Sequence, residues 1–201
     1  YSKRDGYKSD AGRCHSALGN MLLEMGKLQE AKKAYQEHLF YAKRFEDSNG
    51  QAMAEDNLKI IDDLIATDKK IRANVQAIER TAATSRANKA ALAAKILETL
   101  EQCSHMHKEL MVSLGRQLLS LAQELQDDDK EFLALGFIGE GHHKLGQLSA
   151  AKTHFLSQAE QSKRRGRRND EALARKNLAD VLIDAKASTA EIGEQLQFAL
   201  E

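Results

Sequence analysis

The fold is decided by LGNMLLEMGKLQEAKKAY, residues 18–35, which returns as IGEGHHKLGQLSAAKTHF, residues 138–155. The two copies share their internal spacings over many positions: Leu18-Gly19, Gly26, Leu28, Ala31-Lys32, Tyr35, Ala54 and Asn57-Leu58 meet Ile138-Gly139, Gly146, Leu148, Ala151-Lys152, Phe155, Ala174 and Asn177-Leu178. Agreement over so many positions indicates an internal repeat.

The two copies are 120 residues apart, which equals three repeats of about 40 residues. A period near 40 is typical of stacked helix pairs. Leu18, Leu58, Ile138 and Leu178 then occupy the same repeat position. The third copy fits less well, because Glu98 falls at this position and Leu97 lies one residue away. We interpret it as a degenerate copy, or as one with a one-residue adjustment between its helices.

The composition predicts an all-α protein. Proline and tryptophan are absent from the 201 residues, and aromatic residues make up only 5%. Ala, Leu, Lys, Glu and Gln dominate, and these residues favour helices. A β-rich fold would need more β-branched and aromatic residues.

Each repeat is expected to form two antiparallel helices. The expected pairs lie at residues 10–25 and 28–46, 50–65 and 67–84, 88–104 and 106–126, 129–145 and 148–166, and 169–186 and 189 onward. Asp127, Asp128 and Asp129 supply an N-cap cluster, and Ser188–Glu191 fits a capping box. The apolar stripe over residues 67–94 is thin, so a longer and more exposed helix is the alternative there.

The positions Leu18-Gly19, Gly26, Ala31 and Tyr35, with their second copy, resemble the tetratricopeptide (TPR) signature. The continuation of the first copy resembles the repeats of LGN/Pins-type adaptors and Tonsoku-like proteins. The resemblance covers about residues 12–65 and 132–184. It implies one domain over residues 1–201, a right-handed α-solenoid of about five helix pairs with units near residues 10–48, 49–86, 87–127, 128–167 and 168–201. It also implies a non-enzymatic scaffold or adaptor that binds a segment or helix of a partner protein on its concave face.

The signature residues themselves are expected to be scaffold. Small residues such as Gly19 and Gly139 would let the two helices of a pair approach closely. Tyr35 and Phe155 would then fill the space between neighbouring pairs. These residues build the stack and leave the binding face to other positions.

The resemblance places the partner-binding surface on the first helix of each pair. Its polar candidates are Arg13, Asn20, Glu24, Asp56, Asn57, Glu140, His143, Lys176, Asn177 and Asp180. Apolar residues are interspersed among them: Met53, Ile60, Leu133, Leu173 and Ile183. Mixed charge with apolar anchors suits an extended peptide or a partner helix. The alternative is a solvated helix face, and for Asn57 and Asn177 a hydrogen bond to a neighbouring helix.

One basic run supports a second hypothesis. Lys163, Arg164, Arg165, Arg167 and Arg168 could contact phosphates, which favours a chromatin-associated or nucleic-acid-associated repeat protein. The alternative is a basic helix end that complements the helix dipole. No aromatic residue that could stack on bases stands in this run.

The sequence predicts no catalytic residue, cofactor or metal site. Cys103 and His107 would share a helix face, but two ligands are too few for a closed zinc site, and His142-His143 lacks the spacing of a metal-binding helix. A helical metalloprotein built on His105, His107, His142 and His143 is the weaker alternative.

Charge and cysteine content limit the classes of partner and the cellular locations that fit this protein. Lys plus Arg and Asp plus Glu number 30 each, so no overall field favours nucleic acid. Cys14 and Cys103 fit reduced thiols in an intracellular protein, cytoplasmic or nuclear. No run approaches the roughly 20 apolar residues of a membrane span. The start at Tyr1 leads us to expect a longer full protein.

Overall fold

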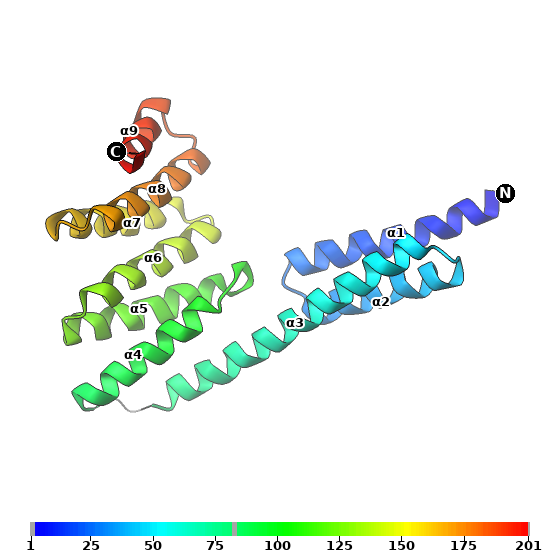
Figure 1. Ribbon diagram of the computed structural model, residues 1–201, viewed down its shortest axis with the longest axis horizontal. Helices are drawn as coiled ribbons and strands as arrows, with labels where there is room; N and C mark the ends of the chain where they lie inside the picture. The colour runs from blue at the N-terminus through cyan, green and yellow to red at the C-terminus, as the bar shows by residue number, and fades with distance from the viewer. Residues whose placement is uncertain (1–2, 82–83, 201) are drawn as a thin grey trace. The chain divides into compact units, whose positions relative to one another are not determined.

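The computed structural model describes residues 3–81 and 84–200, without the side chains of residues 3–9, 105 and 198–200. Over these residues the regular structure consists of nine α-helices and one short 3₁₀ helix, with no strand (Figure 1). The all-α prediction is confirmed. Contacts divide the chain into two compact units, Tyr1–Ala73 (unit 1) and Asn74–Glu201 (unit 2).

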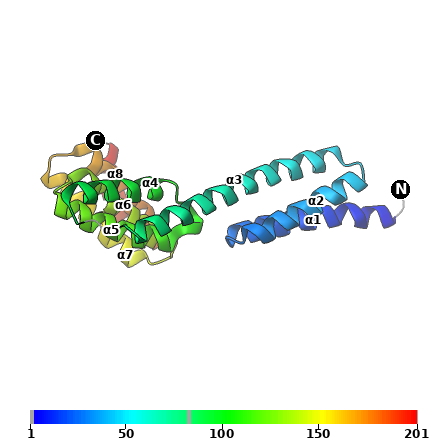
Figure 2. The ribbon, with the colours of Figure 1, turned by 90° about the horizontal axis from the view of Figure 1, so that it is seen from below.

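Unit 1 contains α1 (Lys3–Glu24), α2 (Leu28–Arg44) and the larger part of α3 (Ser48–Glu79). The helices lie side by side, each antiparallel to the one before it, in both views (Figure 1, Figure 2). Ala31 and Tyr35 of α2 pack with Ile61 of α3 in a buried cluster. An ion pair between Lys32 and Asp62 joins the same two helices on the surface. The apolar residues at which α2 meets α3 are therefore buried by stacking, as the repeat predicts.

The predicted helix pair at residues 50–65 and 67–84 is wrong, because α3 is one continuous helix of 32 residues. Thr67 Oγ1 donates to the carbonyl of Asp63 at 2.9 Å, and Arg72 Nε donates to Asp68 Oδ2 at 2.7 Å. Both residues that could have capped a new helix thus bond within the same helix. The longer helix, the alternative that the thin apolar stripe left open, is the one observed.

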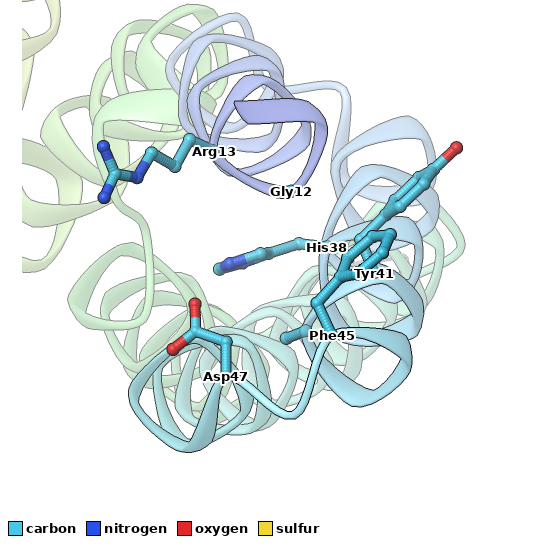
Figure 3. Close-up of a pocket in the computed structure, with 7 residues that line it drawn as sticks. Gly12, Arg13, His38, Tyr41, Phe45 and Asp47 are labelled. Atoms are coloured by element: carbon cyan, nitrogen blue, oxygen red, sulfur yellow. The ribbon is translucent and has the colours of Figure 1, made fainter. Parts of the chain in front are cut away.

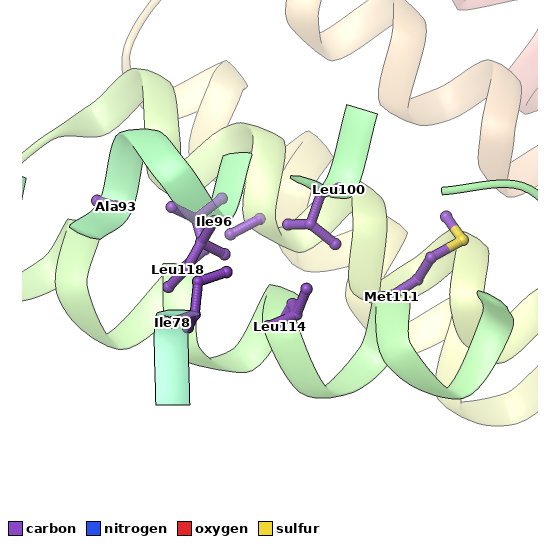
Figure 4. Packing of buried hydrophobic residues seen from close by; sticks show 8 residues of the cluster. Ile78, Ala93, Ile96, Leu100, Met111, Leu114 and Leu118 are labelled. Atoms are coloured by element: carbon purple, nitrogen blue, oxygen red, sulfur yellow. The ribbon is translucent and has the colours of Figure 1, made fainter. Parts of the chain in front are cut away.

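Unit 2 continues with α4 (Arg86–Glu101), the 3₁₀ helix η1 (His105–His107), α5 (Lys108–Leu125), α6 (Asp128–Lys144), α7 (Leu148–Arg164), α8 (Arg168–Asp184) and α9 (Thr189–Leu200). Consecutive helices pack against one another, and α6 also contacts α4 and α8. From residue 128 onward the helices lie within about two residues of their predicted bounds. Figure 4 shows the core of the first half of this unit, where Ile96 and Leu100 of α4 meet Leu114 and Leu118 of α5.

The irregular third repeat is explained by a phase shift of α4. Ala93 is fully buried on α4, as Ala134 is on α6 and Ala174 on α8, although exact repeat spacing would put residue 94 there. Leu97 packs against the core while Glu98 is exposed. The extra turn at η1 lies between α4 and α5 and accommodates the offset. The structure therefore favours the one-residue adjustment.

Helix ends recur at a fixed interval along the chain. Backbone φ is positive at Gly26, Glu46, Gln126, Gly146, Gly166 and Lys186, positions separated by multiples of twenty residues. Such left-handed residues end helices. After the three that are not glycine, the next helix is capped by Asp47, Asp127 or Ser188, whose side chains accept from Gly50 N, Lys130 N and Glu191 N. The Asp127 cap and the Ser188 half of the predicted capping box are confirmed.

The predicted scaffold role of the signature residues is also confirmed. A Cβ added at Gly19 would lie 2.5 Å from Tyr35 Cε1, and one added at Gly139 would lie 2.8 Å from Phe155 Cε1. Both distances are shorter than any stable contact, so the aromatic ring occupies the space that a side chain would need. Glycine is what lets the two helices of each pair come together.

Candidate partner-binding face

The first helices of two successive pairs form a surface in unit 2. Helices α6 and α8 contact each other, and each carries predicted partner-binding residues mostly at spacings of three, four or seven. These positions, which we call the α6–α8 face, are Leu133, Glu140 and His143 on α6 and Leu173, Lys176, Asn177, Asp180 and Ile183 on α8. Residues at such spacings share one side of a helix.

Large apolar side chains are exposed on this face. Leu133 is 38% exposed, Leu173 49% and Ile183 52%. Leu133 and Leu173 occupy the same position in their repeats, so adjacent helices present leucine at corresponding heights. Single exposed leucines are ordinary in proteins, but apolar side chains repeated across neighbouring helices are typical of a binding surface.

The charged side chains of the face are paired with one another. His143 Nε2 lies 2.7 Å from Asp184 Oδ2, which connects α6 to α8. Glu140 pairs with Lys144, and Lys176 Nζ lies 3.1 Å from Asp180 Oδ2. Exposed pairs of this kind are worth about 0–1 kcal/mol, so a bound chain could replace them at low cost.

Asp184 is a residue of this surface that sequence reasoning missed. It follows Asp180 by one helical turn and therefore lies on the same side of α8. That spacing was the available signal. Asn177, at the matching position in the second copy of the repeat, is half-buried on α8, as Asn57 is on α3. Their roles stay predictions.

In unit 1 the candidates Arg13, Asn20 and Glu24 are exposed on α1, and Asp56 is exposed on α3. Asn20 has a structural contact, because its Oδ1 accepts a hydrogen bond of 2.8 Å from the Tyr35 hydroxyl. Phe155 at the equivalent position of unit 2 has no hydroxyl. Glu140, which corresponds to Asn20, forms an ion pair with Lys144 instead. Asn20 thus serves the scaffold in this structure.

Arg13 also lines a small cavity beside α1 and α2 (Figure 3), whose lining residues are Gly12, Arg13, His38, Tyr41, Ala42, Phe45 and Asp47. The cavity has a volume of about 20 Å³, which is room for about one water molecule. His38 is buried, and its Nδ1 has no hydrogen-bond partner within the described part of the chain. Burial lowers the pKa of His38, against the opposing charge of Asp47.

At the position of Gly12, which lines this cavity, the second copy of the repeat has a large residue. Phe132 of α6 is buried where α1 has Gly12. In unit 2 Gln158, the counterpart of His38, donates from Nε2 to the Phe132 carbonyl at 2.9 Å. Unit 2 therefore fills the space that unit 1 leaves open and gives Gln158 Nε2 a hydrogen-bond partner, while Gln158 Oε1 is buried without one among the described residues.

The basic run is partly neutralised by the start of α6. Arg165 Nη2 lies 2.9 Å from Asp128 Oδ1 and 2.6 Å from Glu131 Oε2, and Arg167 pairs with Asp129. Burial alone would raise the pKa of Glu131, but its hydrogen bonds to Arg165 and Gln123 and the charge of Arg165 lower it. Lys163, Arg164 and Arg168 are exposed at the ends of α7 and α8. Three of the five cations thus remain at the surface for a phosphate.

The segment from Cys103 to His107 differs from the helix on which the two-ligand argument rested. Glu101 ends α4, and His107 Nδ1 lies 3.3 Å from the backbone nitrogen of Ser104 within the η1 turn. Burial raises the pKa of the Cys103 thiol to about 11. The His105 side chain lies outside the described residues. Over the part of the chain that the structure describes, no three His, Cys, Asp or Glu side chains gather as metal ligands.

His142 packs between helices rather than on the α6–α8 face. Its ring stacks on His154 of α7, with the centroids 5.4 Å apart, and its Nδ1 contacts Gln147.

The helices within residues 3–81 and 84–200 include none with both the length and the apolarity that a bilayer crossing requires.

No protein-family model matches the sequence, and no curated protein is similar enough to be recognised as a relative. The repeat and the exposed surfaces of its helices are therefore the features that bear on function.

Proposed function

We propose that this chain is a non-enzymatic adaptor, a right-handed α-solenoid of TPR-like helix pairs, that binds a segment of a partner protein on the α6–α8 face. The internal repeat, the packing of consecutive helices and the contacts of α6 with α4 and α8 support a solenoid. Stacked helix pairs form extended surfaces that bind peptides or helices.

The observation that carries the proposal is the exposure of Leu133, Leu173 and Ile183 beside the His143–Asp184 pair. Apolar anchors would enter contacts that exclude water, while Glu140, Lys176 and Asp180 would orient a polar or charged chain. On α3, Met53 is the counterpart of Leu173 and Ile60 that of Asp180, and both side chains are exposed as well.

The test compares two leucine substitutions of equal exposure. Leu133 on the face is 38% exposed and Leu156 on α7, outside it, is 37% exposed. The protein and its Leu133→Glu and Leu156→Glu variants would be used as bait in a cell lysate, with and without nuclease treatment, and captured proteins would be identified by mass spectrometry. We expect capture of a partner by the parent protein and by Leu156→Glu, and at least about a tenfold loss with Leu133→Glu, because a carboxylate would be desolvated at the contact.

Circular dichroism would show that both variants keep the helical content of the parent protein. A partner bound equally by all three proteins would exclude the α6–α8 face. Capture that is lost on nuclease treatment, and is also lost in a variant with Lys163→Glu, Arg164→Glu and Arg168→Glu, would favour the alternative function in nucleic-acid association. Steep salt dependence would accompany that result.

A further inference from the structure

The small cavity of unit 1 is lined by a buried ring nitrogen that has no partner in the described part of the chain. In Figure 3 the His38 ring projects from α2 into the space between Arg13 of α1 and Asp47, the residue that precedes α3. His38 is 5% exposed, and the unpaired atom is its Nδ1. Leaving a buried polar atom unpaired costs free energy, and such atoms commonly bond to ordered water where no protein group reaches them.

The volume and the polarity of the cavity select its ligand. The volume is about 20 Å³, and a single water molecule needs roughly 10–15 Å³. One water molecule therefore fits, while an organic ligand does not. Asp47 Oδ1 accepts a hydrogen bond of 2.9 Å from Gly50 N, but a carboxylate has about four acceptor sites and can accept another. Apolar cavities stay dry, whereas this one offers water several polar partners.

A metal ion is the other small ligand that His and Asp side chains bind. Metal sites in proteins use three or more protein ligands, and the cavity lining supplies only His38 and Asp47. No group of three such side chains gathers anywhere in the described ranges 3–81 and 84–200. The positive charge of Arg13 beside the cavity also opposes a cation. Water is therefore the ligand that fits.

Unit 2 has direct contacts at the positions that correspond to the cavity lining. Gln158, the counterpart of His38, donates from Nε2 to the Phe132 carbonyl at 2.9 Å. Arg167, the counterpart of Asp47, forms an ion pair with an aspartate of α6. The first helix of this pair is thus bonded to the second helix and to the residue that precedes the next one. In unit 1 the two counterparts face the cavity instead.

We propose that this cavity is a hydration site, in which one ordered water molecule hydrogen-bonds to His38 Nδ1 and donates to the Asp47 carboxylate. The water connects α2 to the residue that precedes α3. It can donate to Nδ1 or accept from it, so it satisfies either neutral tautomer of His38. Arg13 can donate a third hydrogen bond, and about three is usual for a buried water. The site is independent of partner binding by the α6–α8 face.

A crystal structure of the full chain, at a resolution that shows ordered solvent, tests the site directly. We expect a water oxygen within about 2.5–3.2 Å of both His38 Nδ1 and an Asp47 carboxylate oxygen. Three results would overturn the proposal: a cavity without solvent density, a protein side chain bonded to Nδ1 in place of water, or a water that contacts Nδ1 but not Asp47.

Nuclear Overhauser transfer from water to the Ala42 methyl group tests the site in solution. Ala42 lines the cavity and is only 5% exposed, so bulk solvent contributes little to this signal. The test variant is Gly12→Phe/His38→Gln, which gives unit 1 the residues of unit 2. We expect the transfer seen in the parent protein to be lost in this variant. The added ring would fill the cavity, and the added amide would donate to the carbonyl of residue 12, as Gln158 does to Phe132.

The matched control is Glu37→Gln, an exposed substitution on α2 outside the cavity lining. It should keep the transfer at the level of the parent protein, and circular dichroism should show the parent's helical content in both variants. No transfer in the parent protein, or equal transfer in the parent and in Gly12→Phe/His38→Gln, would contradict the hydration site. If that variant does not fold, the crystal structure of the parent protein still decides between the outcomes.

Discussion

The pair α1–α2 in unit 1 and the pair α6–α7 in unit 2 are two copies of one repeat with different surroundings. Both pack an aromatic ring on a glycine, Tyr35 on Gly19 and Phe155 on Gly139. They differ where α6 has Phe132 and Gly141, since α1 has Gly12 and Met21 at those positions. The signature therefore fixes contacts within a pair, while the residues between signature positions decide what can pack outside it.

The largest loss of stability is expected when the aromatic ring common to both pairs is removed. Phe155→Ala should cost about 4 kcal/mol, because it removes a buried ring and leaves a cavity, and Tyr35→Ala should cost a similar amount in unit 1. Denaturant unfolding would give the free energy, and hydrogen exchange would locate the loss in the unit that carries the substitution. A cost below about 1 kcal/mol for either one would show that its ring does not hold its pair together.

The next prediction sharpens the difference between the pairs. Ile138→Ala should cost about 3 kcal/mol, since Ile138 is buried between α5 and α6. Leu18→Ala at the same repeat position should cost about 0.5 kcal/mol or less, because Leu18 is half-exposed. Both costs would be measured by denaturant unfolding. Equal costs would mean that the Leu18 side of α1 is covered within one chain.

The smallest effect concerns pH and distinguishes His38 from its counterpart Gln158. Burial lowers the pKa of His38 in the folded state, so the unfolded chain binds protons more readily. The stability that this provides is present above pH 6.5, the ordinary histidine value, and is lost as pH falls through the lower folded-state pKa. His38→Gln should remove this part of the acid sensitivity of unit 1.

The groups around His38 set the control for that experiment. Asp47 and His15 act on it in opposite directions. In unit 2, burial together with the charges of His142 and Arg116 lowers the pKa of His154, so acid sensitivity should persist there. Hydrogen exchange on either side of pH 6.5 would separate the two units. A His38→Gln protein whose unit 1 is as sensitive to acid as the parent would contradict the assignment.

Helix formation and the later helix bounds could be predicted from local sequence. Gly146 and Gly166 adopt the left-handed backbone that ends a helix, and Asp127 and Ser188 cap the helices that follow. These signals act within a few residues, so spacing alone reveals them. The residues of the α6–α8 face were named from repeat spacing and their role in binding stays a prediction, while Asp184 is recognised only through its contact with His143 of another helix.

The continuous helix α3 shows where local signals were insufficient. The interval of twenty residues would put a helix end at residue 66, where the sequence has no glycine. Glu46 and Gln126 end helices without glycine, so this absence did not show that the helix continues. Thr67 and Asp68 could have begun a new helix, but their side chains bond to Asp63 and Arg72 within α3. The choice between a cap and an intrahelical bond depends on whether packing continues, and Ile71 and Ile78 are both buried along the same helix.

The sequence by itself determined that this protein is helical, repeated and built on glycine–aromatic contacts, because those properties follow from propensity and from spacings along one chain. Only the tertiary structure decided which apolar positions are covered. Leu18 and Ile138 are equivalent in sequence, yet only Ile138 has a helix packed over it. Burial is a property of the neighbour as much as of the residue, and the neighbour is supplied by the fold.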